Sequence, residues 1–115
     1  MDGLWIARFS TPLNFGGGVA YFNDGRIYGG DSGYTYIGHF STDGEALHAD
    51  VSVNPYDPSA TDVFGGRETE FHIHLEGIIS ADGLSTIANG YATTGKSYSA
   101  PITGVKFMVS LEKVY

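Results

Sequence analysis

Short runs of alternating apolar and polar residues recur along this chain, separated by turn signals, several of which contain glycine. Examples of these signals are Asp24-Gly25, Asp43-Gly44 and Asp82-Gly83. Aspartate and glycine adopt the backbone conformations that tight hairpins require. Strict alternation is typical of half-buried strands. We therefore predict eight strands, over residues 3–9, 19–23, 26–28, 34–41, 46–54, 70–79, 84–92 and 104–114.

Consecutive strands joined by tight turns form an antiparallel meander, and eight such strands close into a small barrel. The 115 residues suit one domain, residues 1–115. We expect an all-β fold with little helix: a single eight-stranded antiparallel up-and-down β-barrel of the lipocalin-like, calycin-like type. A two-sheet sandwich of the same strands is the alternative. One long connection, residues 55–67, has room for a short helical turn near residues 59–64.

The charge balance restricts the kind of partner. Thirteen acidic and six basic residues give a net charge of −7. Nucleic-acid binding relies on Lys and Arg, so we expect no nucleic-acid partner. Cysteine is absent, the first residues lack the basic and apolar segments of a signal peptide, and no run reaches the ~20 apolar residues of a membrane helix. These features predict a soluble cytoplasmic protein without a membrane partner or cofactor, which binds a protein or a small molecule.

The tetrapeptide Gly30-Asp31-Ser32-Gly33 also surrounds the nucleophile of trypsin-like serine proteases. That nucleophile needs a base and an oxyanion hole, on a chain about twice this long. All four histidines follow Ser32 here. A turn between strands explains each residue of the tetrapeptide, since Gly, Asp and Ser all favour turns. We therefore expect a turn, and no enzyme.

The histidines are candidates for a metal site. Residues two apart on a strand share a face, so His72 and His74 form a polar row with Glu70 and Glu76. His48 on the preceding strand, and His39 before it, extend this row. Such a cluster has the ligands of a Zn²⁺ site. The alternation places it on the outer face, however, which favours a solvated or pH-sensitive surface over a metal centre.

The apolar rows would fill the barrel interior. The aromatic residues that would line a ligand cavity are Trp5, Tyr34, Tyr36, Phe40, Phe71 and Phe107. A small apolar ligand or lipid is therefore an alternative partner. Gly3-Leu4-Trp5 resembles the Gly-x-Trp of lipocalin first strands, where a basic residue, here Lys106 or Lys113, packs over the tryptophan. The apolar residues that we expect to face outward and mark an interface are Tyr28, Ile37, Ile79, Tyr91 and Met108.

One longer pattern resembles a known family. A glycine and a phenylalanine near the start are followed by DGRIYGGDSGYTYIGHF, a turn and ALHADVSV. This order resembles the GrlR family, in which Gly-Gly-Asp follows a short strand and a Tyr-x-Gly strand comes next. The resemblance is clearest over residues 24–53 and weakens after residue 66. It implies a small cytoplasmic lipocalin-like β-barrel that forms a homodimer.

The resemblance also implies a function. GrlR-like proteins are negative regulators of type III secretion genes; they bind and sequester a transcriptional activator and do not bind DNA. The founding regulator has a Glu-Asp-Glu-Asp run in a turn between two central strands. The matching turn here is residues 42–45, in which Asp43 and Glu45 keep the charge, and the resemblance implies that these two residues bind the partner. Only these two of the four turn residues are acidic, whereas all four are acidic in the founding regulator. An ordinary solvated hairpin turn is therefore the alternative interpretation.

Overall fold

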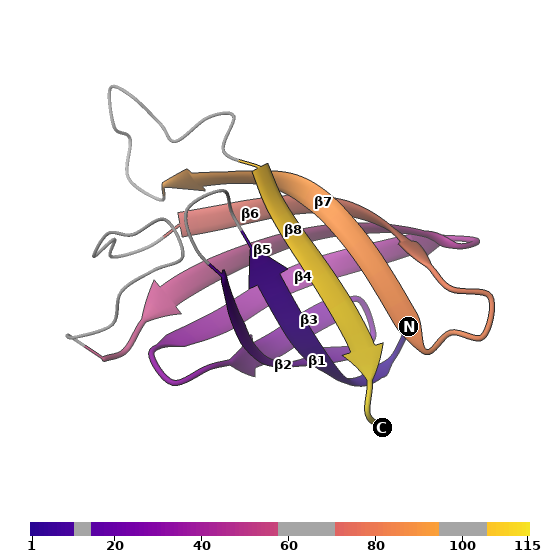
Figure 1. The fold of residues 1–115 in the computed structure, drawn as a ribbon, viewed down its shortest axis with the longest axis horizontal. Helices are drawn as coiled ribbons and strands as arrows, with labels where there is room; N and C mark the ends of the chain where they lie inside the picture. Colours follow the sequence, from indigo (N-terminus) through magenta and orange to yellow (C-terminus); the bar gives the residue numbers. More distant parts are fainter. Residues whose placement is uncertain (11–14, 58–70, 95–105) are drawn as a thin grey trace.

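The computed structural model describes residues 1–10, 15–57, 71–94 and 106–115, and these residues form a closed antiparallel β-barrel of eight strands (Figure 1). The strands are β1 (Gly3–Ser10), β2 (Phe15–Asn23), β3 (Arg26–Gly30), β4 (Tyr34–Asp43), β5 (Ala46–Pro55), β6 (Phe71–Ile79), β7 (Ser85–Thr94) and β8 (Lys106–Lys113). The predicted barrel is thereby confirmed and the sandwich is excluded. The helical turn expected near residues 59–64 lies outside the described residues.

Each strand pairs with its neighbours in the sequence, and β8 returns to pair with β1. The register at this closure runs from Trp5 opposite Lys113 to Ser10 opposite Met108. Closure gives both terminal strands a partner on each side, which removes the exposed edges of an open sheet.

No helix among the described residues is long and apolar enough to cross a membrane.

Tight turns set the register of two hairpins. Asp24 and Gly25, between β2 and β3, have φ angles of 50° and 76°. Two consecutive positive φ values fit a type I′ turn, for which Asp-Gly is a preferred sequence. Between β4 and β5, Gly44 has a φ of 60°, whereas Glu45 has no positive φ. That pattern fits a type II′ turn, whose first central position favours glycine.

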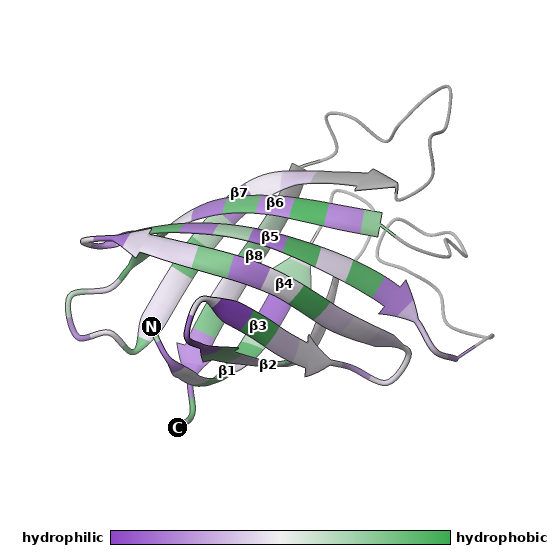
Figure 2. Cartoon of the chain, turned by 180° about the vertical axis from the view of Figure 1, so that it is seen from behind, coloured by the Kyte–Doolittle hydropathy of each residue, from purple (hydrophilic) through white to green (hydrophobic). Residues whose placement is uncertain are grey.

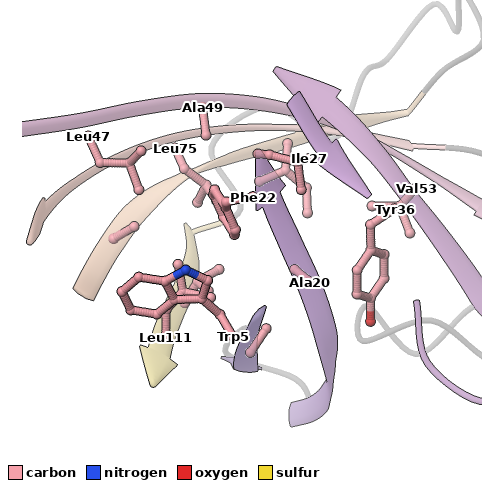
Figure 3. Close-up of a cluster of buried hydrophobic side chains, with 14 of the residues drawn as sticks. Trp5, Ala20, Phe22, Ile27, Tyr36, Leu47, Ala49, Val53, Leu75 and Leu111 are labelled. Carbon is pink, nitrogen blue, oxygen red and sulfur yellow. The ribbon is translucent and has the colours of Figure 1, made fainter. Parts of the chain in front are cut away.

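Alternation along the strands directs one set of side chains into the barrel. Figure 2 shows hydrophilic and hydrophobic residues alternating along β5 and β6. The interior includes a chain of aromatic rings. The Trp5 and Phe22 centroids lie 6.2 Å apart, edge to face (Figure 3). Those of Phe22 and Phe40 lie 5.1 Å apart, also edge to face. Such contacts add to the hydrophobic gain of burying large rings.

Two sequence predictions were wrong in detail. β2 begins at Phe15, not at residue 19, because residues 15–18 form strand pairs with β1, including Gly17 opposite Arg8. Cross-strand pairing overrides the weak strand preference of glycine. Ile79 was expected to face outward, but it is half-buried and packs against the core. Alternate residues of β6 from Phe71 onward face inward, and Ile79 is one of them. Its neighbour Ile78 is exposed.

Candidate functional site

The acidic turn lies at the tip of the β4–β5 hairpin, which projects at one end of the molecule (Figure 1). Asp43 is the last residue of β4 and pairs with Ala46, and Gly44 and Glu45 form the two-residue loop. Asp43 and Glu45 are both exposed, and an added side chain at Gly44 would meet nothing within 4 Å. The turn therefore presents two carboxylates on an uncovered hairpin tip.

A second turn lies beside this tip. The N–H of Ile79, at the end of β6, donates to the carbonyl of Glu45 over 2.7 Å, so the β6–β7 turn starts next to the acidic turn. That second turn carries exposed Asp82. The hydroxyl of Ser80 and the N–H of Leu84 donate to this carboxylate and hold the pKa of Asp82 below its usual value. Asp82 therefore remains ionised at neutral pH and adds a third negative charge at this end.

Sequence reasoning did not connect Asp82 with the acidic turn. Residues 81–83 were predicted as a turn, but only the pairing of β5 with β6 brings that turn next to Glu45. The predicted up-and-down topology could have indicated that the two turns lie at the same end of the barrel, because alternate turns of a meander do so.

Ser32 lies in the turn between β3 and β4, as predicted, and its side chain is exposed. The Asp31 carboxylate organises this turn by accepting hydrogen bonds from the N–H groups of Gly33, at 2.9 Å, and Tyr34, at 2.8 Å. It also accepts a short hydrogen bond from the hydroxyl of Tyr36. Asp31 is therefore engaged in holding the turn, which gives the tetrapeptide a structural role.

The hydroxyl of Tyr36 lies under this turn. Burial and the adjacent Asp31 carboxylate, which accepts its proton in a hydrogen bond, raise the pKa of Tyr36 well above its ordinary value. Gly18 on β2 leaves room for this hydroxyl, since a Cβ at that position would lie 2.7 Å from it. Tyr36 thus stays neutral and ties the wall of the barrel to the β3–β4 turn.

The four histidines stand on the outer face, as the alternation predicted. His39, His48, His72 and His74 are all exposed, on β4, β5 and β6. Three of them form cross-strand pairs: His48 Nδ1 lies 3.3 Å from Glu76 Oε1, His74 Nδ1 lies 2.8 Å from Asp50 Oδ1, and His72 Nδ1 lies 2.9 Å from Ser52 Oγ. Within the described residues, no group of three potential ligands is arranged to hold a metal ion.

The predicted cavity residues form part of the packed interior. Trp5, Tyr34, Tyr36 and Phe71 are buried, and Phe40 is half-buried against the same core. The ring centroids of Tyr34 and Phe71 lie 6.1 Å apart. The side chain of Phe107 lies outside the described residues. The described members of this set each pack against another aromatic ring of the interior.

The expected contact between a basic residue and the tryptophan is present. The Nζ atom of Lys113 lies 6.0 Å from the centroid of the Trp5 ring, within the range of a cation–π interaction. The indole N–H of Trp5 donates to the carbonyl of Met1 over 3.0 Å. Both contacts fasten the chain termini at the β1–β8 closure. Lys106, the other candidate, lies at the far end of β8.

Comparison with known proteins does not assign the chain to a family, because no family model and no curated protein matches it.

Proposed function

We propose that this protein is a non-enzymatic negative regulator of the GrlR type, which binds and sequesters a transcriptional activator protein. The observation that carries this proposal is the acidic hairpin tip, where Asp43 and Glu45 are exposed and Asp82 lies on the adjoining turn. The partner would offer a basic surface, because a negative patch selects a positive one and steers its encounter.

Several features support a binding function. The net charge of −7 disfavours direct contact with DNA, so an effect on transcription would pass through another protein. The hairpin that carries the acidic tip is also held in place by extensive strand pairing. Ten residues of β4 pair with ten of β5, and eight of these β5 residues pair with β6. A rigid strand pair holds a recognition element in place at little entropic cost on binding.

The test is affinity capture from the native cells, with the tagged parent protein and a charge-removing variant compared side by side. Asp43→Asn/Glu45→Gln keeps the shape of the turn and removes both charges. We expect the parent to retain a protein with a DNA-binding domain, identified by mass spectrometry, and the variant to lose most of it. The matched control is Asp2→Asn/Asp24→Asn, which removes two exposed charges outside the β4–β5 and β6–β7 turns and should retain the partner.

Two results would count against the proposal. If the parent captures no regulatory protein, the proposal that the acidic turn binds an activator is contradicted. Equal loss of the partner with the acidic-turn variant and with the control would show that net charge, and not this turn, determines binding.

A further inference from the structure

Two isoleucines lie side by side on the outer face of β6 and β7. Ile78 and Ile87 are directly opposite each other in the strand register, and each is 61% exposed. Removing large aliphatic side chains from water is favourable, so a partner that covers both gains binding free energy. Single exposed apolar residues are ordinary on protein surfaces, whereas contiguous groups mark interaction sites. The isoleucine pair, Ile78 and Ile87, is therefore a candidate interface.

The apolar surface continues from the isoleucine pair onto β8. Met108 is 48% exposed and lies two residues from Ser110, which is directly opposite Ile87. An open groove of about 360 Å³ lies here, and its lining includes Ile87, Met108 and Ser110. The small side chain of Ser110 leaves space between the larger ones. The groove can therefore accept an apolar side chain of a partner.

The strand register joins the isoleucine pair to the acidic hairpin tip. Asp43 is directly opposite Ala46, and Ala46 is directly opposite Ile78. One row on the outer face thus runs from Asp43 through Ala46 and Ile78 to Ile87. The β4–β5 and β6–β7 turns project at the same end of the molecule (Figure 1). The acidic tip and the isoleucine pair therefore belong to one continuous surface.

The charges at the tip end of this row are negative. Asp43, Glu45 and Asp82 are all exposed. In the described ranges of the chain, no lysine, arginine or histidine forms an ion pair with any of the three. These carboxylates are therefore available to a cationic partner.

Two further carboxylates flank the isoleucine pair, and each already has a basic neighbour. Glu76, two residues from Ile78 on the same face, lies 3.3 Å from His48. Glu112, on β8, lies 3.3 Å from Arg8. Each basic group balances at most the charge of its own partner. The three tip carboxylates therefore set the sign of the charge beside the isoleucine pair, and that sign is negative.

The exposed apolar wall of β1–β4 differs in this respect; its exposed members are Val19, Tyr21, Tyr28 and Ile37. Charges of both signs adjoin that wall, since Asp24 and Arg26 are both exposed at the β2–β3 turn. Charge complementarity therefore selects no occupant for the wall, whereas it selects a cationic one for the surface that contains the isoleucine pair.

We propose that the isoleucine pair and the acidic tip form one docking surface for an amphipathic segment that carries lysine or arginine beside its apolar side chains. The cationic groups of the segment pair with Asp43, Glu45 and Asp82, and its apolar side chains cover Ile78 and Ile87. The segment belongs to the activator of the proposed function, on which this assignment rests.

Net charge favours a basic segment over a second copy of the chain. Two copies each carry a charge of −7 and repel each other as they approach. A basic segment is attracted by the same field, and its apolar side chains match the exposed isoleucines. A basic amphipathic segment therefore complements both the charge and the apolar character of this surface.

The test is a nuclear magnetic resonance titration of the isotope-labelled protein with three synthetic peptides of equal length. The first carries leucine on one face and lysine on the other, the second has serine in place of leucine, and the third has glutamate in place of lysine. We expect the leucine–lysine peptide to shift the amide signals of Asp43, Glu45, Ile78 and Ile87. It should bind about tenfold more tightly than either of the other peptides.

Variants of the isoleucine pair isolate the apolar contribution. Ile78→Thr/Ile87→Thr keeps β-branched residues, which suit strands, and removes most of the exposed apolar surface. It should weaken binding of the leucine–lysine peptide about tenfold and leave the serine–lysine peptide unchanged. Ile87→Thr alone should show a smaller loss in the same direction. The matched control Val19→Thr/Ile37→Thr alters two residues that are each 48% exposed, on β2 and β4, and should change neither.

The acidic-turn variant Asp43→Asn/Glu45→Gln isolates the contribution of charge. It should weaken binding of both lysine peptides, because each relies on the carboxylates. Sedimentation of the parent and of the isoleucine variant, run beside the titration, reports self-association.

Three outcomes would overturn the proposal: unchanged binding of the leucine–lysine peptide by the isoleucine variant, equal binding of the glutamate peptide by the parent, or a dimer that the isoleucine variant dissociates. The first outcome, with binding still lost in the acidic-turn variant, would leave the proposed function standing with a tip that binds by charge alone. Failure to capture an activator from cells counts against the proposed function whatever the peptides do, so the two failures are distinguishable.

Discussion

At the scale of single residues, Asp31 explains the tetrapeptide that resembles a protease motif. Its carboxylate accepts hydrogen bonds from two backbone N–H groups and from the hydroxyl of Tyr36, and the hydroxyl of Tyr56 donates to its carbonyl over 2.6 Å. Aspartate suits this position because its short side chain reaches the backbone of its own turn. Ser32 contributes an exposed side chain to that turn.

We predict that Asp31→Ala destabilises the protein and that Ser32→Ala does not. Removal of the carboxylate takes the acceptor from the Gly33 and Tyr34 N–H groups and from the Tyr36 hydroxyl. The expected loss is about 1–3 kcal/mol of unfolding free energy. Ser32→Ala should stay within about 0.5 kcal/mol of the parent, as exposed substitutions usually do. Urea unfolding of the three proteins measures both values, and equal stabilities would contradict this role of Asp31.

The raised pKa of Tyr36 predicts that the folded protein loses stability in alkaline solution. Its pKa is raised in the folded protein, above the value of about 10 in an unfolded chain. Folding therefore favours the protonated phenol, and this contribution is fully present below pH ~10 and is lost as the pH rises beyond it. Melting temperatures from about pH 8 to 11 should fall more steeply for the parent than for Tyr36→Phe. Parallel curves for the two proteins would show that Tyr36 is not responsible.

At the scale of strands, glycines mark places where two backbones come close. A Cβ at Gly38 of β4 would clash with the carbonyl oxygen of Asp50 and lie 2.9 Å from the Cα of Val51 on β5. The clashing atoms belong to the backbone, so they cannot move aside as a flexible side chain can. The Tyr-x-Gly pattern of the sequence thus has a physical reason in the pairing of β4 with β5.

We predict that Gly38→Ala is more disruptive than alanine at a glycine with free space. Overpacking at a paired backbone costs about 1–3 kcal/mol or more. Gly83, in the β6–β7 turn, has a φ of 73° and nothing within 4 Å of an added Cβ, so Gly83→Ala incurs only the conformational cost of about 1 kcal/mol. Thermal unfolding compares the two. A Gly38→Ala protein at least as stable as Gly83→Ala would contradict the close approach of β4 and β5.

The sequence predicts these elements well where alternation and turns agree, and less well where pairing decides. The strand that contains Tyr34, Tyr36 and Gly38 was expected from its alternation. The first residues of β2 were missed, because Gly16 and Gly17 have no strand preference of their own and are held in the strand by pairing with Phe9 and Arg8 of β1. The acidic turn was predicted at Asp43 and Glu45, but its neighbour Asp82 depends on the β5–β6 pairing.

At the scale of the whole molecule, the barrel closes where the two ends of the chain meet. Trp5 of β1 pairs with Lys113 of β8, lies fully buried in the core and contacts Phe22. The closed topology was predictable from the number of strands and the short turns. The exposed apolar wall of β1–β4 was predicted only in part, at Tyr28 and Ile37, because outward apolar positions are recognised as one patch only when the register is known.

We predict that the barrel unfolds as one cooperative unit. Trp5 is the only tryptophan of the chain and reports on the closure between β1 and β8, whereas far-ultraviolet circular dichroism reports on all strands. In a closed barrel with one core, the two signals should change at the same urea concentration. Substitution of Trp5 by Ala should cost about 3–5 kcal/mol, as for other large buried rings. A tryptophan transition that precedes the dichroism transition would show that the closure opens independently.

The central claim is that the acidic hairpin tip binds an activator protein. Its most direct test is calorimetric titration of the captured, purified partner into the parent, into Asp43→Asn/Glu45→Gln and into the control Asp2→Asn/Asp24→Asn. We predict at least about tenfold weaker binding for the acidic-turn variant, or roughly 1.4 kcal/mol, and near-parental affinity for the control. An acidic-turn variant that binds as tightly as the parent would contradict the claim.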